Sequence, residues 1–502
     1  MAVTSTAVPS GTIATIFGNQ FVYKNLRQGL AGLPKKIAIL ATYDPLKTSV
    51  VPDVPVQVFT EVEAGDKFGF GFPAHLAAKQ VLRKSGIVPV FIFPIEEAAA
   101  AVAAAGTITV ANTATSSGTI SLYIAGTRIP VNITKSQTAA QIATAMVAAI
   151  TANTTKLPVT AAVNGTTTTQ VDITSKYLGL IANDITLAIN LTESEKDLTP
   201  GATSFTIVAM ASGAGTPTIT AALANFGETW YTHVVNTFGP ESTTMAALAT
   251  FNEDDRWDTL INKPFVSFYG TIGTYSTVTT ITDALKIDRT NASIPSPGAY
   301  SLPLELAALA CGLIAARSQD DPAQPYTGLE LDGLLPGPDS GQWTHTVADA
   351  AEKLGASWTV VRDGVITLKD IVTHYHRTGE DPPAFRYVVD IMKLMEWAYN
   401  VSLVFKGSNW EGKILVDDAD IVSNPNARRP KDAIAEIFKL ADGAAFAAIL
   451  TRPDITKANT QASIDIANPN RINIQTLIVL SGATRVISLT TNFGFNFGSI
   501  AA

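Results

Sequence analysis

The amino-acid sequence predicts a multidomain protein of mixed α/β and α+β class. An α/β core is expected to be interrupted by a β-rich insert, and extended β-strand arms are expected at both ends of the chain. Three observations predict this architecture. Apolar strand patterns alternate with helix patterns in residues 31–100 and again in residues 206–370. Residues 101–205 carry short alternating strands instead, and the two ends carry apolar residues without a helical period.

The first core segment predicts a β-α-β unit. Short apolar strands are expected at residues 35–43 and 88–95, with a helix between them at 72–86. Pro73 lies near the start of that helix and Gly86 just past its end, the usual placement of these residues at helix termini. The two strands are therefore expected to run parallel. One face of the helix is expected to be solvated and carries His75, Lys79 and Arg83.

The insert, residues 101–205, predicts a compact β-rich or α+β module. A helix is expected after Thr138, which is spaced from Gln141 as in a capping box. The alanine-rich run at 96–106 suits either a helix or a small-residue linker. The helix stripe consists of Ile142, Met146 and Ile150. Strand patterns occur at 118–133 (two strands around Ala125 and Gly126), 157–163, 169–175 and 184–191.

Helix and strand patterns alternate again after the insert, so the insert is expected to interrupt one domain. A tight hairpin is expected at 358–368, because Asp363 and Gly364 supply the positive φ angles of its turn. A C-terminal α+β domain is expected at 371–485. The core strands are expected at 230–238 and 265–270, and the core helices at 241–262, 302–317 and 346–354. A helix at 385–405 carries the apolar stripe Val388, Ile391, Met392, Met395 and Tyr399.

Both ends of the chain predict extended arms, at residues 1–30 and 486–502. The stretch 485–497 alternates apolar and polar residues as a β-strand does, and such an edge invites aggregation unless something pairs with it. Its partner is either its own domain or another chain. The apolar residues expected to make contacts between subunits are Ile13, Ile16, Phe17, Phe21, Tyr23, Ile487, Leu489, Phe493, Phe495 and Phe497.

Composition and charge argue against several classes of function. The 502 residues carry a formal net charge of −8, and Lys and Arg form no run that could follow a phosphate backbone, so direct nucleic-acid binding is not expected. The longest apolar stretch, 306–316, is shorter than the roughly 20 residues of a bilayer span. Cys311 lies in that stretch and is expected to be a buried helix thiol. Charged residues make up only 16%, which fits either surface buried against partners or a large core.

Candidate chemistry is sparse. His374 and His376 are two residues apart and would share a face of a strand, as metal ligands can, but no further ligand cluster accompanies them, so no metal site is expected. His233 and His345 are isolated and are expected to be packed or capping. Carboxylate runs beside turns and helix ends are expected to cap amides or face water, at 252–258, 318–322 and 416–420. No cofactor-binding or catalytic motif is recognised.

Six segments occur together in the order seen in one family. They are "GLPKKIAILATY", "FPAHLAAKQVLRKSGIVPVFIFPI", "GTISLYIAGTRIPVNITKSQTAAQIATAMVAAI", "TAALANFGETWYTHVVNTF", "PSPGAYSLPLELAALACGLIAARSQDDPAQPYTGLELDGLLPG" and "RDGVITLKDIVTHYH". In this order the chain resembles the tail sheath proteins of contractile-tailed phages, the Mu-like group especially, over most of its length.

The resemblance implies a structural protein without catalysis or cofactor. Many copies would form a helical stack of rings around a tail tube, and contraction would drive the tube through the host envelope. The arms would cross to neighbouring subunits and complete a small sheet there, the domain at 371–485 would face the tube, and the insert would protrude. The implied partners are further copies, the tail tube protein, and the baseplate and tail terminator proteins, without direct nucleic acid or membrane insertion. The implied location is the virion, with assembly in the host cytoplasm.

Two other classes of function are open to the sequence. One is a multidomain surface or adhesion protein whose insert binds a ligand. The other is a cytoplasmic α/β enzyme that uses the carboxylates of 252–258. Electron micrographs would distinguish sleeves, which the sheath interpretation requires, from discrete particles.

Overall fold

The computed structural model describes residues 12, 30–377, 379 and 384–493. Contacts between Cα atoms divide the chain into two units, which are described separately. Unit 1 comprises residues 1–31 and 400–481, and unit 2 comprises residues 32–399 and 482–502. No helix within the described residues combines the length and the apolar character that a membrane span requires.

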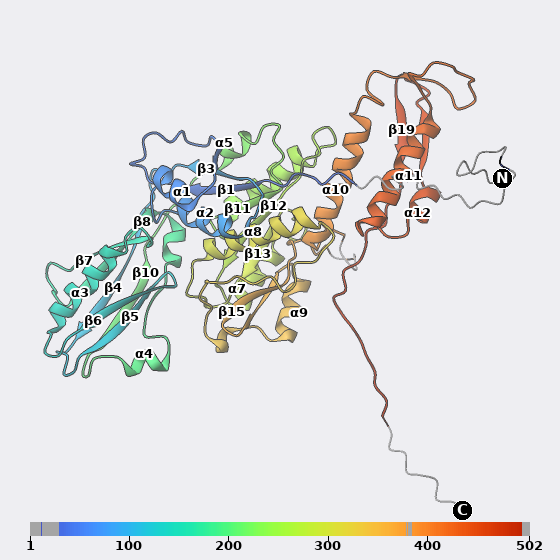
Figure 1. The fold of residues 1–502 in the computed structure, drawn as a ribbon. Helices are drawn as coiled ribbons and strands as arrows, with labels where there is room; N and C mark the ends of the chain where they lie inside the picture. Colours follow the sequence, from blue (N-terminus) through green and yellow to red (C-terminus); the bar gives the residue numbers. More distant parts are fainter. Residues whose placement is uncertain (1–11, 13–29, 378, 380–383, 494–502) are drawn as a thin grey trace, which may run out of the picture. The chain divides into compact units, whose positions relative to one another are not determined.

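Unit 2 is built on a six-stranded sheet (Figure 1). Its strands are β1 (Ile37–Thr42), β2 (Val56–Val58), β3 (Val90–Ile95), β11 (His233–Asn236), β12 (Val266–Thr271) and β13 (Asn291–Pro295). Their order is β13-β12-β11-β1-β3-β2, and all neighbours are parallel except β2 with β3. The predicted parallel pair, β1 with β3, is confirmed. Strand β1 also pairs with β11, so segments on either side of the insert share one sheet.

Among the described residues, four helices pack on this sheet: α2 (Pro73–Lys84), α5 (Thr220–Ala224), α6 (Ser242–Phe251) and α8 (Pro303–Asp320). Helix α1 (Glu61–Phe68) packs on α2, and α7 (Tyr275–Asp283) and α9 (His345–Lys353) pack against each other. Helices α2 and α8 contact each other closely, since a Cβ at Gly312 would lie 2.9 Å from the Val81 carbonyl oxygen. Cys311 of α8 is buried, as predicted.

One expectation for α2 is wrong. His75 is only 1% exposed, because α1 packs beside α2 and covers the side that was expected to be solvated. Its Nδ1 accepts a hydrogen bond from the Gly71 N–H at 3.1 Å, and its Nε2 lies 3.7 Å from the Glu61 carboxylate.

A β-rich module lies between β3 and β11 in the chain. It consists of β4 (Ala103–Ala111), β5 (Gly118–Ile124), β6 (Thr127–Ile133), α3 (Ala139–Ala152), β7 (Val159–Val163), β8 (Gln170–Leu178), β9 (Leu187–Ile189), α4 (Glu193–Asp197) and β10 (Ser204–Ala211). One sheet has the order β10-β4-β8-β7 and the other β6-β5-β9, and α3 packs against strands of both. The predicted capping box of Thr138 and Gln141 is confirmed.

The borders of this module differ from the expected ones. The alanines at 103–105 belong to β4, neither to a helix nor to a linker, because β4 pairs with β8 on one side and β10 on the other. Strand β10 continues to Ala211, past the boundary expected at residue 205. The chain enters and leaves the module side by side, since Val102 and Ala214 form an antiparallel bridge with N–O distances of 2.8 and 3.2 Å.

The remainder of unit 2 contains a hairpin and most of a long helix. Strands β14 (Trp358–Arg362) and β15 (Val365–Asp370) form the predicted hairpin, with φ angles of 50° at Asp363 and 77° at Gly364. Helix α10 (Val388–Phe405) buries its predicted stripe, of which only Tyr399 stays half-buried. The contacts place α10 as far as Tyr399 in unit 2, whereas the sequence analysis begins the C-terminal domain at residue 371.

Unit 1 is small. Its elements after α10 are β16 (Ile414–Leu415), β17 (Ala427–Arg428), α11 (Pro430–Phe446), α12 (Pro453–Ala458), β18 (Gln461–Ile464) and β19 (Ile472–Gln475). Helix α11 supplies most of its apolar interior through Ala433, Ile437, Leu440, Ala441 and Ala444. The hairpin of β18 and β19 packs against α11.

Candidate functional site

The C-terminal arm presents apolar side chains to solvent. Residues 481–493 contain neither helix nor strand, and Ile487, Leu489 and Phe493 are 83%, 83% and 84% exposed. Large exposed apolar side chains gathered in one short segment indicate an interaction site. The remaining predicted contact residues, Ile13, Ile16, Phe17, Phe21, Tyr23, Phe495 and Phe497, lie outside the described residues.

The root of this arm is held to unit 2 by Arg485. Its Nη1 contacts the Asp370 carboxylate at the end of β15. Its guanidinium carbon lies 3.4 Å from the centre of the Tyr387 ring, immediately before α10. Val486, the next residue, is already 87% exposed. The arm therefore changes from anchored to exposed within one residue.

The segment that follows the N-terminal arm is held by α10. Glu396 Oε1 accepts a hydrogen bond from the Leu33 N–H at 2.7 Å, and Lys35 Nζ donates to Glu396 Oε2 at 3.1 Å. The Lys35 and Glu396 side chains are only 1% and 3% exposed. Burial lowers the pKa of Lys35, and the Glu396 carboxylate acts against that shift.

The β18–β19 hairpin of unit 1 has open edges. The strands pair from Gln461 with Gln475 to Ile464 with Ile472, and no third strand pairs with them within the described part of the chain. The Asp465 N–H donates to Arg471 at 2.9 Å, so by antiparallel alternation Ala462, Ile464, Ile472 and Ile474 direct their backbone N–H and C=O groups outward. Two-stranded hairpins are marginally stable alone, and this one offers edges on which another strand can pair.

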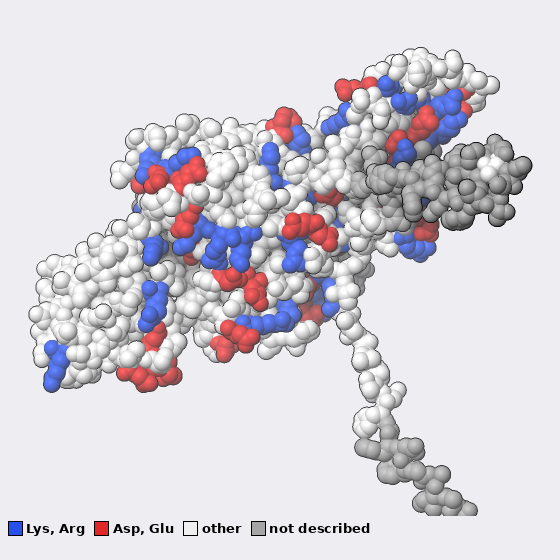
Figure 2. All heavy atoms as spheres, viewed as in Figure 1, with Lys and Arg blue, Asp and Glu red and all other residues white. Residues whose placement is uncertain are grey.

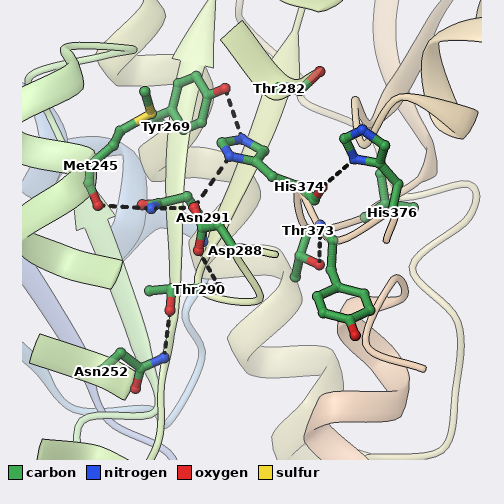
Figure 3. A network of polar contacts seen from close by, with 12 residues as sticks. Met245, Asn252, Tyr269, Thr282, Asp288, Thr290, Asn291, Thr373, His374 and His376 are labelled. Carbon is green, nitrogen blue, oxygen red and sulfur yellow. Dashed lines mark hydrogen bonds and ion pairs between the residues drawn. The ribbon is translucent and has the colours of Figure 1, made fainter. Parts of the chain in front are cut away.

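The two histidines weighed as metal ligands have separate partners (Figure 3). His374 is fully buried, with Nε2 3.0 Å from the Tyr269 hydroxyl and Nδ1 3.3 Å from Asp288. His376 Nε2 lies 3.1 Å from Asp283 instead. The hydrogen bond from His376, followed by one from Lys286, lowers the pKa of Asp283. Within the described residues, no group of three His, Cys, Asp or Glu side chains is placed to hold a metal ion.

This network attaches the chain after β15 to the edge of the core sheet. Thr373 forms a bridge with Ala292 of β13, and the His374 N–H donates to the Asn291 carbonyl at 3.1 Å. The Asn291 side-chain amide donates in turn to Asp288 at 2.8 Å and to the Met245 carbonyl at 3.1 Å (Figure 3). The two histidines thus act as structural residues that secure the path from the hairpin to α10.

Of the other two isolated histidines, His233 is packed as predicted, whereas His345 is exposed. His233 is fully buried and stacks on Phe268. Burial, and next the charge of Lys35, lower the pKa of His233 to about 3, so it is neutral at pH 7. His345 is the first residue of α9 and meets the edge of the Trp358 ring at 5.6 Å.

The carboxylates at 252–258 are largely engaged in surface contacts. Glu253 accepts two hydrogen bonds from Arg289, at 2.9 and 2.7 Å, and that guanidinium lies 4.1 Å from the Trp257 ring centre. An open groove of about 1050 Å³ adjoins them, lined mainly by apolar atoms. On the face shown in Figure 2, charges of both signs are interspersed over the core, and the insert carries few.

Comparison with known proteins identifies a relative of the chain. No family model matches it. Over 428 residues it is 26% identical to the Mu-like prophage FluMu tail sheath protein of Haemophilus influenzae, which covers 84% of this chain and 85% of that protein. The chain is a homologue of a phage tail sheath protein. The resemblance seen in the sequence is thereby confirmed, and the relative is a structural sheath protein rather than an enzyme.

One solved structure shares the fold of this chain, and another is similar to it over most of its length. The contracted helical sheath of the anti-feeding prophage aligns with a TM-score of 0.50 at 11% identity, over 95% of this chain and 99% of that one. A sheath tail protein from Listeria innocua aligns with a TM-score of 0.48 at 11% identity, over 91% and 94% of the two chains.

Sequence reasoning missed the residues that hold the arm roots. Asp370 and Arg485 are 115 positions apart, and Lys35 and Glu396 are 361 apart, so no local pattern pairs them. The only signal was a single cation, Arg485, placed directly before the alternating apolar run.

Proposed function

We propose that the chain is the subunit of a contractile phage tail sheath, which polymerises around a tail tube and contracts to drive that tube through the host envelope. The observation that carries this proposal is the exposed apolar arm, with Ile487 and Leu489 both 83% exposed, in a homologue of a tail sheath protein. An arm of this kind is complete only when a partner covers it.

The partner that fits the arm is the β18–β19 hairpin of a second copy. Strand addition takes its affinity from backbone hydrogen bonds and its specificity from alternate side chains. The outward backbone groups of Ala462 and Ile474 are available for those hydrogen bonds. The half-buried isoleucines of the hairpin offer an apolar face to the alternate side chains of the added strand. The N-terminal arm, through Ile13, Ile16, Phe17, Phe21 and Tyr23, would supply a further donated strand.

The energetics favour a polymer over a dimer. One buried phenylalanine contributes about 2–3 kcal/mol. Ordering a flexible backbone costs about 1–2 kcal/mol per residue. A single arm is therefore marginal, whereas a subunit bound by several neighbours in a lattice gains the sum of its contacts.

Contraction requires two packings of the same subunit, the contracted one lower in free energy. Subunits joined to one another through arms suit this requirement, because the contacts between their cores can be exchanged while the donated strands stay paired. The further partners we propose are the tail tube, baseplate and tail terminator proteins, with the virion as the location and the host cytoplasm as the place of assembly.

Deletion of either arm tests this function. Chains lacking residues 486–502 or 1–20 are expected to give folded monomers by circular dichroism and sedimentation, and no tubes by negative-stain microscopy, while the full chain forms tubes. A finer variant replaces Ile487 and Leu489 by serine, with Ser488→Ala and Thr490→Ala on the polar face as its matched control. Loss of folding on deletion, or tubes that form without the arms, would contradict strand donation. Discrete particles from the full chain would contradict the sheath role itself.

A further inference from the structure

The C-terminal arm has a sharply defined root. Arg485 is held on two sides, by the Asp370 carboxylate and by the Tyr387 ring, and the ion-paired side chains are 22% and 21% exposed. Val486 and Ile487 directly after it are 87% and 83% exposed. The two contacts come from different elements, since Asp370 ends β15 and Tyr387 precedes α10 and bridges to Val372.

The surroundings of Arg485 favour a cation at this position. Glu352 of α9 is hydrogen-bonded by Tyr387 and lies within electrostatic range of Asp370. Burial, and then the charge of Asp370, raise the pKa of Glu352, and Arg485 acts against that rise. Two carboxylates and an aromatic ring therefore converge on one guanidinium, whose flat face suits stacking and whose edge suits a carboxylate.

We propose that Arg485 is a positioning residue that fixes where the C-terminal arm leaves the core, so that the part of the arm that can reach a second copy begins at Val486. This inference rests on the proposed function for the identity of the second copy, but not for the anchor itself. Residues 486–502 span at most about 55 Å when fully extended, at about 3.3 Å per residue. That length lets the arm extend beyond the surface at which Arg485 holds it.

Removal of the anchor would lengthen the free segment. The preceding attachment is at Ser481, whose N–H donates to the Ile449 carbonyl at 3.1 Å in unit 1. Without Arg485 the arm would start four residues earlier, which adds about 13 Å of reach. A longer tether holds its end at a lower effective concentration and permits a wider range of distances between linked copies. The expected consequence is a looser spacing of subunits, with strand donation preserved.

Spin labels test the anchor in dilute protein kept monomeric, as checked by sedimentation. A label at Thr484→Cys is expected to gain mobility several-fold in Arg485→Ala, and partly in Arg485→Lys, which keeps the charge but loses the flat stacking face. A label at Thr490→Cys, beyond the anchor, is expected to be mobile in every background. Arg362→Ala, an exposed arginine at the turn end of the same hairpin, is the matched control and should change neither label. The native Cys311 is buried and does not compete for the label.

Equal mobility at position 484 with and without Arg485 would overturn the inference. Assembled material gives a second reading, since tubes of Arg485→Ala are expected to form with a broader spread of subunit spacing than wild-type tubes in cryo-EM. Tubes with unchanged spacing would also overturn it. Failure of the wild-type chain to form tubes would instead count against the proposed function, and the label at position 484 would still decide whether Arg485 anchors the arm.

Discussion

The β-rich insert and the β18–β19 hairpin differ in how completely each forms a core of its own. The insert arranges seven strands in two sheets, and α3 packs against both, so that Ile108, Val131 and Ile142 are all fully or nearly fully buried within one chain. The hairpin has two strands of four residues, half-buried isoleucines and outward backbone groups. The first region has its own core within the single chain, whereas the second, within the described residues, has no third strand beside it and is the acceptor under the function we propose.

Under the proposed function, this difference separates a region that folds on its own core from a region expected to pair with another copy. A module with its own core tolerates removal when its ends lie together. An open two-stranded hairpin gains stability only when a further strand pairs with it. We therefore expect assembly to depend on the hairpin and the arms, and to be indifferent to the insert.

The largest expected effect comes from blocking one hairpin edge. Ala462→Pro removes an outward N–H that the hairpin itself does not use, so the monomer is expected to fold while tube formation is lost. Ala462→Val keeps that N–H and is the matched control. Tube formation by the proline variant in negative-stain micrographs would show that this edge of β18 is not the acceptor.

Excision of the insert should affect assembly little. Joining Val102 to Ala214 through Asn-Gly converts their bridge into a two-residue hairpin turn. The core loses some polar contacts, among them the hydrogen bond from Leu178 N–H to Glu97 at 2.8 Å, so a modest decrease in melting temperature is expected. Tubes should still form in the microscope. Their absence, with the shortened chain folded, would break the distinction between the two regions.

The smallest effect concerns acid stability. In the insert, burial acts to raise the pKa of Glu195, but hydrogen bonds from Tyr123 and Arg128 outweigh it and hold the pKa at about 2. A carboxyl group whose pKa is lowered by folding stabilises the fold at pH values above its pKa in the unfolded chain. That stabilisation is lost as the pH falls from about 4.5 to 2. Because Arg128 is partly exposed, we expect about 1–2 kcal/mol.

Glu195→Gln should therefore reduce stability at pH 7 and flatten its dependence on pH below 4.5. The matched control is Glu193→Gln, two residues away, whose side chain is 86% exposed. In the hairpin, a hydrogen bond from Asn473, followed by one from the Ala467 N–H, lowers the pKa of the half-buried Asp465, and Asp465→Asn should cause a smaller change. Thermal unfolding between pH 2 and 7 measures all three. Equal profiles for Glu195→Gln and Glu193→Gln would refute the assignment.

Local sequence patterns predicted much of the fold. The features that they missed depend on contacts between residues far apart in the sequence. The hairpin around Asp363 and Gly364 and the capping box of Thr138 follow from a few adjacent residues. The burial of His75 does not, because whether a helix face is solvated depends on what packs against it, here α1. For the candidate site, alternation marked Ile487 and Leu489 as apolar contact residues, but it could not show the anchor at Arg485.

The two ends of the chain should respond unequally to ionic strength. The Lys35–Glu396 pair is almost fully withdrawn from water, whereas Arg485 and Asp370 keep about a fifth of their side-chain surface exposed. Dissolved ions weaken attraction between exposed charges over about 8 Å at physiological concentration and affect buried pairs much less. At high salt concentration, the contact between Arg485 and Asp370 is therefore expected to weaken while the Lys35–Glu396 pair holds. Salt would then release the C-terminal arm at its root and leave the attachment near the N-terminal arm in place.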